Sequence, residues 1–383
     1  MKIPFGKPLL DNTERNAVMR VLNSDILTHG KNSLLFEKKF QKFTKINYCT
    51  SVANCTAALH ISYLLIGLKK GDEVILPSQT HVATAHSIEI TGAKPIFVDS
   101  DDAHTGNINI EKIEKKINNK TKAICVVHFL GKPVDMSQIS KLTKKYNLYL
   151  IEDCALALGA KFKNKHVGTF GDFSAFSFYP AKHITTADGG MLGIKKKVFF
   201  DRAKKIKAFG VDKRFQERKV PGDYDVKYLG INYRLDELRS AMGIFQLKKI
   251  NYILNKRKKN YTFLKNRVEN IKGIKILNSK SEKNKISSYY CFSFCLLGGL
   301  KKKRLQIIKK LNKKGIGTSI YYPKILPEFT YYKKKYNIRS SEFKNAKIIS
   351  DNSICLPIAP HINKNNLIFI EKNLKEIIQR YFK

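Results

Sequence analysis

The stretch SVANCTAALHISYLLIGLKKGDEVILP (residues 51–77) contains the pattern that decides the fold. An apolar strand ends near Ala53, a helical pattern opens at Thr56, and a second apolar strand, EVILP, follows that helix. Buried strands that alternate with helices are typical of parallel sheets, because a parallel pair needs a long crossover connection. The stretch therefore predicts a strand–helix–strand unit.

The same alternation extends through the first half of the chain. Further predicted strands are NYCTSVA, KPIFVD, KAICVVHF and LYLIED. The predicted helices are TAALHISYLLIGL, VATAHSIEITG, INIEKIEKKI and MSQISKLTKKY. Right-handed crossovers between such strands place helices on both faces of one sheet. We therefore expect an α/β fold with a mostly parallel central sheet.

The pattern changes after about residue 240. One long helical stretch is expected from Leu235 to about Asn270, as a link between two domains. The strands expected after it are IKILN, YYCFSFCLL and SIYYP, and helices are expected near Lys301–Lys314, Phe343–Ser350 and Asn365–Tyr381. This pattern predicts a large domain with an N-terminal arm over residues 1–240. The linking helix and a smaller α+β domain would occupy residues 241–383.

The charge is extreme: 72 Lys and Arg against 31 Asp and Glu give a formal net charge of +41. Such a surface suits a polyanionic partner, either nucleic acid or a membrane. The lysines are spread over many helix faces, as in EKIEKKINNKTK, and are not gathered with aromatic residues into one stripe. We therefore favour compositional bias and expect no nucleic-acid or membrane partner. A non-catalytic protein that binds through its basic surface stays open as an alternative.

The cysteines and the N-terminus predict a reduced, cytoplasmic protein. Seven scattered cysteines are an odd number without paired spacing, so a disulfide framework is not expected. Cys291 and Cys295 would share one side of a strand, and without a second pair we expect core packing and no metal. The first 16 residues hold no apolar signal stretch, and no apolar run is long enough to span a bilayer.

Two segments of the first half place polar groups where strands end. Thr56 sits at a helix start, where a hydroxyl and free N–H groups suit a phosphate, although threonine also simply favours that position. Asp153 in YLIEDCALALGA follows an apolar strand, at the sheet edge where α/β folds gather their ligands. A carboxylate there can keep a pyridinium nitrogen protonated. The alternative role for Asp153 is capping a helix.

Two further segments carry a lysine and a polar loop. In FGDFSAFSFYPAKHITTADGGMLGI (residues 170–194), Ser177 and Lys182 lie in a turn between two buried strands. Desolvation lowers the pKa of an amine and makes it a nucleophile for a carbonyl. In GDYDVKYLGINYRLDELRSAMGIFQL, Asn232 precedes an amphipathic helix. Asn232 either has only a local role in its loop or belongs to a polar segment that reaches a neighbouring subunit.

In these four segments the chain resembles the sugar aminotransferases of the DegT/DnrJ/EryC1/StrS family. The resemblance runs from FGKP near the N-terminus to LPIAPHI near the C-terminus and is most specific over residues 177–190. It implies a type I aminotransferase fold, a homodimer with shared active sites, and pyridoxal 5′-phosphate (PLP) as cofactor.

The resemblance also assigns roles by position. Lys182 would carry the cofactor and later move a proton, and Asp153 would pair with the pyridinium nitrogen. The other expected cofactor-binding residues are Cys55 and Thr56 with Ser177 at the phosphate, His81 against the ring face, and Asn232 from the other subunit. Leu156 departs from the family, which usually has His or Gln there, so the ring oxygen O3′ would need another partner.

The expected reaction is transamination of a nucleotide-linked keto-6-deoxy-sugar, with glutamate as the donor. Amination at C3 and at C4 both stay open, and the product would serve surface polysaccharide or glycan biosynthesis. The alternative is a pyridoxamine-dependent keto-deoxysugar 3-dehydratase, but those relatives have histidine in place of the lysine at position 182. LTHG and GTSIYYP match regions that line the sugar site, so the expected substrate-binding residues are His29, Tyr321 and His361.

Overall fold

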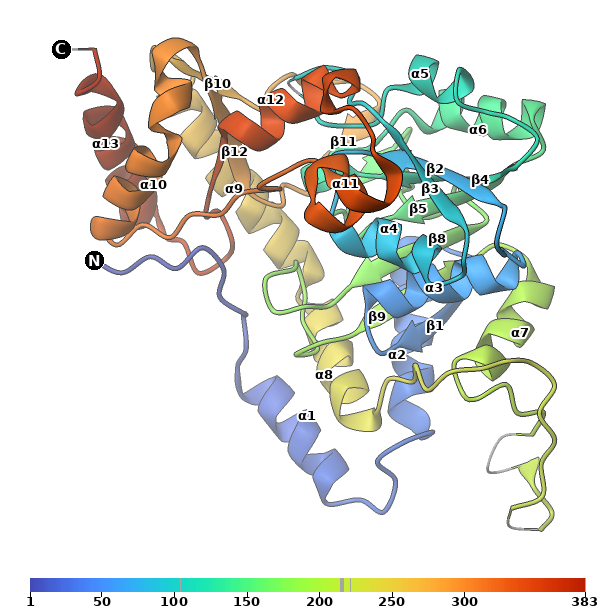
Figure 1. Cartoon of the computed structure of the whole chain (residues 1–383). Coiled ribbons are helices and arrows are strands. Elements are labelled where there is room, and N and C mark those ends of the chain that lie inside the picture. The colour runs from blue at the N-terminus through green and yellow to red at the C-terminus, as the bar shows by residue number, and fades with distance from the viewer. Residues whose placement is uncertain (104, 214–216, 221, 383) are drawn as a thin grey trace.

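A computed structural model describes residues 1–103, 105–213, 217–220 and 222–382 (Figure 1). A seven-stranded sheet with the order β1-β9-β8-β5-β4-β2-β3 forms its centre. Its strands are β1 (Tyr48–Val52), β2 (Glu73–Pro77), β3 (Lys94–Val98), β4 (Thr121–Val127), β5 (Tyr149–Asp153), β8 (Phe173–Ser177) and β9 (Gly190–Ile194). Strands β3, β2, β4, β5 and β8 pair in parallel, whereas β9 is antiparallel to both β8 and β1. The expected α/β fold with a mostly parallel sheet is confirmed.

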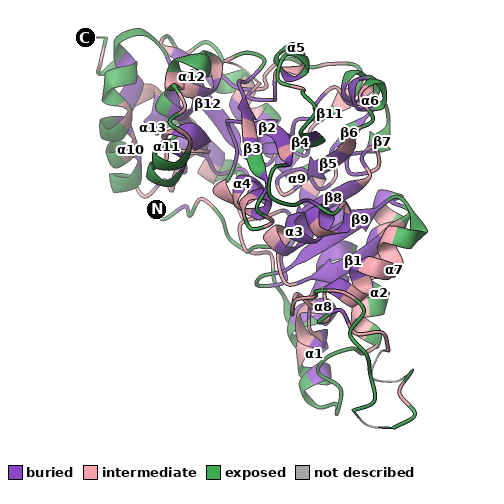
Figure 2. Cartoon of the chain, turned by 45° about the vertical axis from the view of Figure 1, so that its right-hand side comes forward, coloured by how far each residue is buried: buried purple, intermediate pink, exposed green. Residues whose placement is uncertain are grey.

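Helices cover both faces of this sheet, because alternate strand residues point to opposite sides. Val74 and Leu76 of β2 enter the core under α3 (Cys55–Leu65), while Ile75 enters another core. The other helices packed on the sheet are α4 (Val82–Glu89), α5 (Ile110–Glu114), α6 (Met136–Lys145) and α7 (Lys197–Ile206). Figure 2 shows the strands of the sheet as the buried centre of the molecule.

A second core lies around a smaller antiparallel sheet of order β10-β12-β13. Its strands are β10 (Ile274–Ile276), β12 (Phe292–Leu296) and β13 (Ser353–Leu356). The helices around it are α9 (Ile250–Val268), α10 (Arg304–Lys313), α12 (Lys344–Asn352) and α13 (Lys364–Gln379). The helix α11 (Thr330–Tyr336) instead packs Tyr332 into the core of the large sheet. A third small sheet joins β11 (Lys285–Ile286) to β6 (Lys161–Phe162) and β7 (Lys165–His166). The division near residue 240 stays a prediction.

Two expectations about elements were wrong. The single long helix is two helices, α8 (Glu237–Lys248) and α9, which meet at Lys249. At this junction the Lys249 ammonium lies 2.6 Å from a carboxylate oxygen of Glu14, a residue distant in sequence. The SIYYP segment is not a strand: Ser319 makes one isolated bridge to Cys355, and β13, which was not predicted, pairs with β12 instead.

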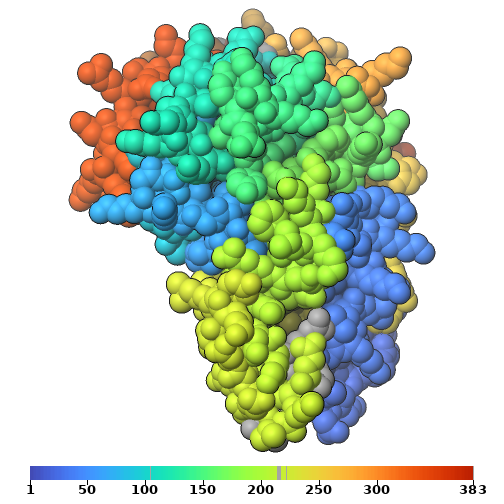
Figure 3. Space-filling view, turned by 90° about the vertical axis from the view of Figure 1, so that its right-hand side faces the viewer, coloured from blue at the N-terminus to red at the C-terminus, as the bar shows by residue number. Residues whose placement is uncertain are grey.

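The N-terminal helices α1 (Asn12–Leu22) and α2 (Lys31–Thr44) lie beside the segment that follows α7 (Figure 3). Lys207 of that segment lies 3.3 Å from the Glu37 carboxylate of α2. The N-terminus of α2 is capped by a residue distant in sequence. The buried Glu237 carboxylate accepts hydrogen bonds from the N–H groups of Asn32 and Ser33 at 2.7 and 3.0 Å. Among the described residues, no helix has the length and apolarity needed to cross a membrane.

Candidate active site

Asp153 lies at the carboxyl end of β5, where the sequence placed it. The side chain is buried, and one oxygen accepts from the Thr84 hydroxyl at 2.8 Å while the other accepts from the Ala155 N–H at 3.0 Å. The Thr84 hydroxyl is in turn 2.9 Å from the Thr80 hydroxyl. A carboxylate oxygen can accept two hydrogen bonds, so Asp153 retains capacity for another donor. Sequence reasoning missed both threonines, because nothing in the local pattern of α4 and the turn before it singles them out.

Lys182 lies in the loop between β8 and β9, as the hairpin pattern predicted. Its backbone N–H donates to the Tyr179 carbonyl at 2.9 Å, and its Nζ lies 5.4 Å from the ring centre of Tyr290. Burial lowers the pKa of the Lys182 ammonium, and the nearby Cys55 and Asp153 act in the opposite direction. Desolvation increases the fraction of free amine near neutral pH, which is what a nucleophilic lysine needs.

The start of α3 forms a cradle of backbone groups close to Ser177. The helix begins at Cys55, with Asn54 as its cap, so Thr56 is its second residue and not its first. The first N–H groups of a helix have no partner within it and suit an anion. Gly190 pairs with Ser177 on one side and with Val52 on the other, which brings the end of β8 next to this turn.

Gly190 also packs directly against that turn. A Cβ atom at Gly190 would lie 2.5 Å from the carbonyl carbon of Asn54 and 2.8 Å from the nitrogen of Cys55. Real Cβ atoms essentially never approach so closely, so the cradle depends on a glycine at this position.

His81 caps α4 and also lies near Lys182. Its Nδ1 accepts from the Ala83 N–H at 3.2 Å, so in the neutral ring Nε2 carries the proton. The ring meets Tyr322 edge to face at 5.6 Å. Partial desolvation, followed by the charge of Lys182, lowers the His81 pKa. The ring is therefore neutral and close to the lysine.

Asn232 lies on an exposed segment that precedes α8. Its backbone forms an isolated bridge with Ala208, and the carbonyl of the next residue, Tyr233, accepts from the Ala53 N–H at 2.8 Å. This backbone hydrogen bond connects the segment to the residues just before the cradle, whereas the Asn232 side chain is exposed. His29 lies in a different cluster, where burial and then the charge of Arg234 lower its pKa.

Tyr321 lies close to Lys182, and His361 forms a hydrogen bond to the N-terminal segment. The Tyr321 hydroxyl is 2.8 Å from the hydroxyl of Tyr290, whose ring lies under Lys182. His361 Nε2 donates to the Pro4 carbonyl at 2.9 Å, and burial lowers the His361 pKa, so this ring is neutral.

Leu156 lies in an apolar cluster that also contains Phe129 and Tyr290. Its side chain is buried and offers no hydrogen bond, as expected for a leucine at this position. Cys291 and Cys295 lie in the same cluster, which confirms that they pack in the core.

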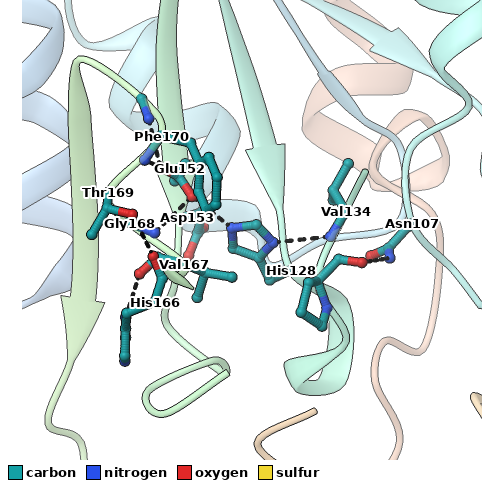
Figure 4. Close-up of polar contacts among 12 residues, drawn as sticks. Asn107, His128, Val134, Glu152, Asp153, His166, Val167, Gly168, Thr169 and Phe170 are labelled. Atoms are coloured by element: carbon teal, nitrogen blue, oxygen red, sulfur yellow. Dashed lines mark hydrogen bonds and ion pairs between the residues drawn. The ribbon is translucent and has the colours of Figure 1, made fainter. Parts of the chain in front are cut away.

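His128, Glu152 and Cys154 lie close enough together to suggest a metal site, but their bonding argues against one. Figure 4 shows the polar contacts of Glu152 and His128. The Glu152 carboxylate accepts four hydrogen bonds at 2.6 to 3.0 Å, three from backbone N–H groups and one from His128 Nε2. His128 Nδ1 accepts from the Val134 N–H at 3.1 Å. Burial raises the pKa of the Cys154 thiol, so no thiolate is available. The cluster is a saturated structural network at the end of β5.

Together these groups fit PLP. Asp153 offers acceptor capacity to a ring nitrogen, Lys182 offers an amine with a lowered pKa, and the start of α3 offers N–H groups to a phosphate. These three parts come from three segments, which the sheet brings together at one edge.

Comparisons with known proteins agree with this geometry. GDP-perosamine synthase from Escherichia coli is 35% identical over 376 residues, which cover 98% of each chain. A UDP-4-amino-4,6-dideoxy-N-acetyl-beta-L-altrosamine transaminase from Campylobacter jejuni is 32% identical and covers 99% of this chain and 98% of its own. The solved structure of PseC, an aminotransferase from Helicobacter pylori involved in pseudoaminic acid biosynthesis, superposes with a TM-score of 0.93 at 29% identity, over 99% of this chain and 100% of PseC.

The family profile matches almost the whole chain, over residues 8–375. The match includes the segments of Asp153, Lys182 and Asn232, together with the cradle at the start of α3. The chain therefore belongs to the DegT/DnrJ/EryC1/StrS aminotransferase family, whose members depend on PLP.

Proposed function

We propose that this aminotransferase moves an amino group from glutamate to the ketone of a nucleotide-linked 6-deoxy-sugar, and that the amino sugar enters a surface polysaccharide. The similar proteins support the substrate class, since their names include a GDP-perosamine synthase and a UDP-amino-sugar transaminase. SpsC from Bacillus subtilis, a spore coat polysaccharide biosynthesis protein, is 28% identical over 98% of this chain. The observation that carries the proposal is the desolvated Lys182 amine near the buried Asp153 carboxylate.

The roles of the site residues follow from their contacts. Bound PLP supplies a ring that accepts electrons from the carbon that loses a proton. Lys182 would hold the cofactor through Nζ and, as a free amine, would move a proton at the reacting carbons. Asp153 would keep the ring nitrogen protonated, and Thr84 with the Ala155 N–H fixes the orientation of its carboxylate. His81 would stack on the ring face.

The phosphate is assigned to the cradle. The N–H groups of Cys55 and Thr56 point along the start of α3, where the helix dipole favours negative charge. The Ser177 hydroxyl, at the end of β8, would be a further donor to the phosphate. His29, Tyr321 and His361 stay proposals for the sugar side of the site.

We further propose a homodimer in which Asn232 reaches the phosphate of the partner's site. The support is the exposed apolar surface next to Asn232: Leu229 is 88% exposed, and Phe209 and Val226 are more than half exposed. Apolar patches of this kind mark interaction surfaces. We also propose that the protein is cytoplasmic and that its two domains divide near residue 240.

The direct test is to reduce the PLP-loaded protein with borohydride and map the labelled peptide. The label is expected on Lys182, and the Lys182→Ala variant should lose both the label and the yellow colour. Lys195→Ala is a matched control, because Lys195 follows the same hairpin but its side chain is exposed. A label on another lysine, or no label on a folded protein, would overturn the assignment.

A further inference from the structure

His183, the residue that follows Lys182, is buried and hydrogen-bonded to a segment distant in sequence. Only 4% of its surface is exposed, and its Nε2 lies 3.0 Å from the carbonyl oxygen of Ser288. A carbonyl oxygen can only accept, so Nε2 carries the proton and donates. The His183 ring also lies 5.8 Å from the ring of Tyr290, and Lys182 Nζ lies 5.4 Å from the centre of that same ring. The buried histidine and the reactive amine therefore lie beside one aromatic side chain.

Ser288 is a junction between three segments of the chain. Besides the bond from His183, its N–H donates to the Gly131 carbonyl at 3.1 Å and its hydroxyl donates to the Leu156 carbonyl at 3.0 Å. Leu156 follows Asp153 by three residues, just past β5, and Gly131 lies just past β4. One buried serine thus connects the loop of the reactive amine to the segment of the buried carboxylate.

This junction is closely packed. Gly131 has a φ of +84°, and a Cβ atom there would lie 2.1 Å from the Ser288 hydroxyl oxygen and 2.9 Å from the Leu156 carbonyl oxygen. Any side chain at this position would therefore displace the serine. Ser288 is fully buried, so the carbonyl that accepts from His183 has little freedom to move.

His183 makes this contact as a neutral ring. Burial, followed by the charge of Arg257, lowers the pKa of His183 well below its usual value, so the imidazole is uncharged near pH 7. A neutral ring adds no charge beside the Lys182 amine. Its influence on the amine therefore comes from its hydrogen bond and its packing.

We propose that His183 is a positioning residue: its hydrogen bond to Ser288 fixes the loop of Lys182 relative to the segment that follows β5. The inference rests on the proposed function, in which Lys182 and Asp153 hold one cofactor ring between them. Covalent attachment needs the amine in a defined position against the cofactor's aldehyde carbon, and a displacement of about 1 Å can cost roughly 100-fold in rate. Loss of the hydrogen bond should therefore weaken covalent attachment more than it weakens binding of the phosphate and the ring.

Three variants separate this role from a merely structural one. His183→Leu removes the donor and keeps a side chain of similar size, whereas His183→Gln keeps an N–H donor near the position of Nε2. His166→Leu is the matched control, because His166 is another buried histidine, and its hydrogen bonds go to the backbone of Gly159 and Val167. The variants and wild type are compared in urea unfolding, which measures stability, and in titrations of the cofactor-free protein.

The titrations use PLP and pyridoxamine 5′-phosphate, which has an amine in place of the aldehyde and cannot attach to a lysine. In His183→Leu we expect the PLP affinity and the rate of PLP attachment to Lys182, followed by absorbance, each to fall roughly 10- to 100-fold, with the affinity for pyridoxamine phosphate unchanged. His183→Gln should lie between wild type and His183→Leu. His166→Leu should match wild type in both titrations even though it loses stability.

Two results would overturn the inference: a folded His183→Leu protein that attaches PLP as wild type does, or one that loses affinity for both cofactor forms equally. A failure of the proposed function is distinguishable from either result. If wild type attaches PLP at Lys182 and His183→Leu slows that attachment, but no sugar nucleotide is aminated, the proposed function fails while the positioning role stands.

Discussion

Gly190→Ala tests whether the turn before α3 binds the cofactor phosphate. The new Cβ would lie 2.5 Å from the Asn54 carbonyl carbon and 2.6 Å from its oxygen. Ordinary van der Waals contact begins at 3.4 Å, so the turn must retreat by about 0.9 Å. The obstacle is backbone and not the end of a flexible side chain, so it cannot simply rotate away.

The expected magnitudes follow from this displacement. Overpacking at a buried position costs about 1–3 kcal/mol, so the free energy of unfolding should fall within that range. Moving N–H donors by this distance should weaken their bonds to a charged phosphate by about 1.5–3 kcal/mol, or roughly 10- to 100-fold in PLP affinity. Gly299→Ala is the matched control, because a Cβ there meets nothing within 4 Å.

The assay is a titration of the PLP-free protein with PLP, followed by its absorbance, alongside urea unfolding. Gly190→Ala should bind PLP much more weakly while unfolding in one cooperative transition. If it binds PLP as tightly as Gly299→Ala, the phosphate does not lie at this turn and the reasoning is wrong.

Three other perturbations test separate contacts. Thr84→Val removes the 2.8 Å bond to Asp153, so kcat should fall about tenfold with both KM values kept; an unchanged kcat in steady-state assays would show that Asp153 needs no such support. Burial lowers the pKa of His166 to about 4 from 6.5, so below pH 6.5 the unfolded chain binds a proton that the folded chain does not, and about 3 kcal/mol of stability should be lost by pH 4. The urea midpoint should change less between pH 6.5 and pH 4 in His166→Gln than in wild type. An equal change in both proteins would refute the assignment of this pH dependence to His166. Glu237→Ala should lose about 2 kcal/mol of stability in urea melts, because two N–H groups at the start of α2 lose their acceptor; a loss no greater than that of an exposed Glu111→Ala would contradict the long-range cap.

The sequence predicts best what depends on local pattern. Apolar runs that alternate with amphipathic helices are enough to predict the central sheet, and the hairpin around Lys182 follows from its two apolar strands and glycines. The break at Lys249 is not predicted by this reasoning, and at this junction Lys249 contacts Glu14, which is distant in sequence. Local propensity is routinely overridden by such tertiary contacts.

The same limit explains the site residues that were missed. Thr84 occupies an ordinary helical position, and only the fold brings it to Asp153. Tyr321 was expected near the sugar site from the family resemblance, but the SIYYP strand expected around it was wrong, because only Ser319 of this segment bridges to β13 at the edge of the small sheet.

The most direct measurement of the central claim is transfer of a labelled amine. The PLP-loaded protein is incubated with ¹⁵N-labelled L-glutamate and a panel of nucleotide-linked 4-keto- and 3-keto-6-deoxy-sugars, and product masses are read. The account predicts one nucleotide sugar whose ketone is replaced by a labelled amine, with none formed by Lys182→Ala. An unlabelled deoxy product, or unchanged sugars with every acceptor, would contradict it.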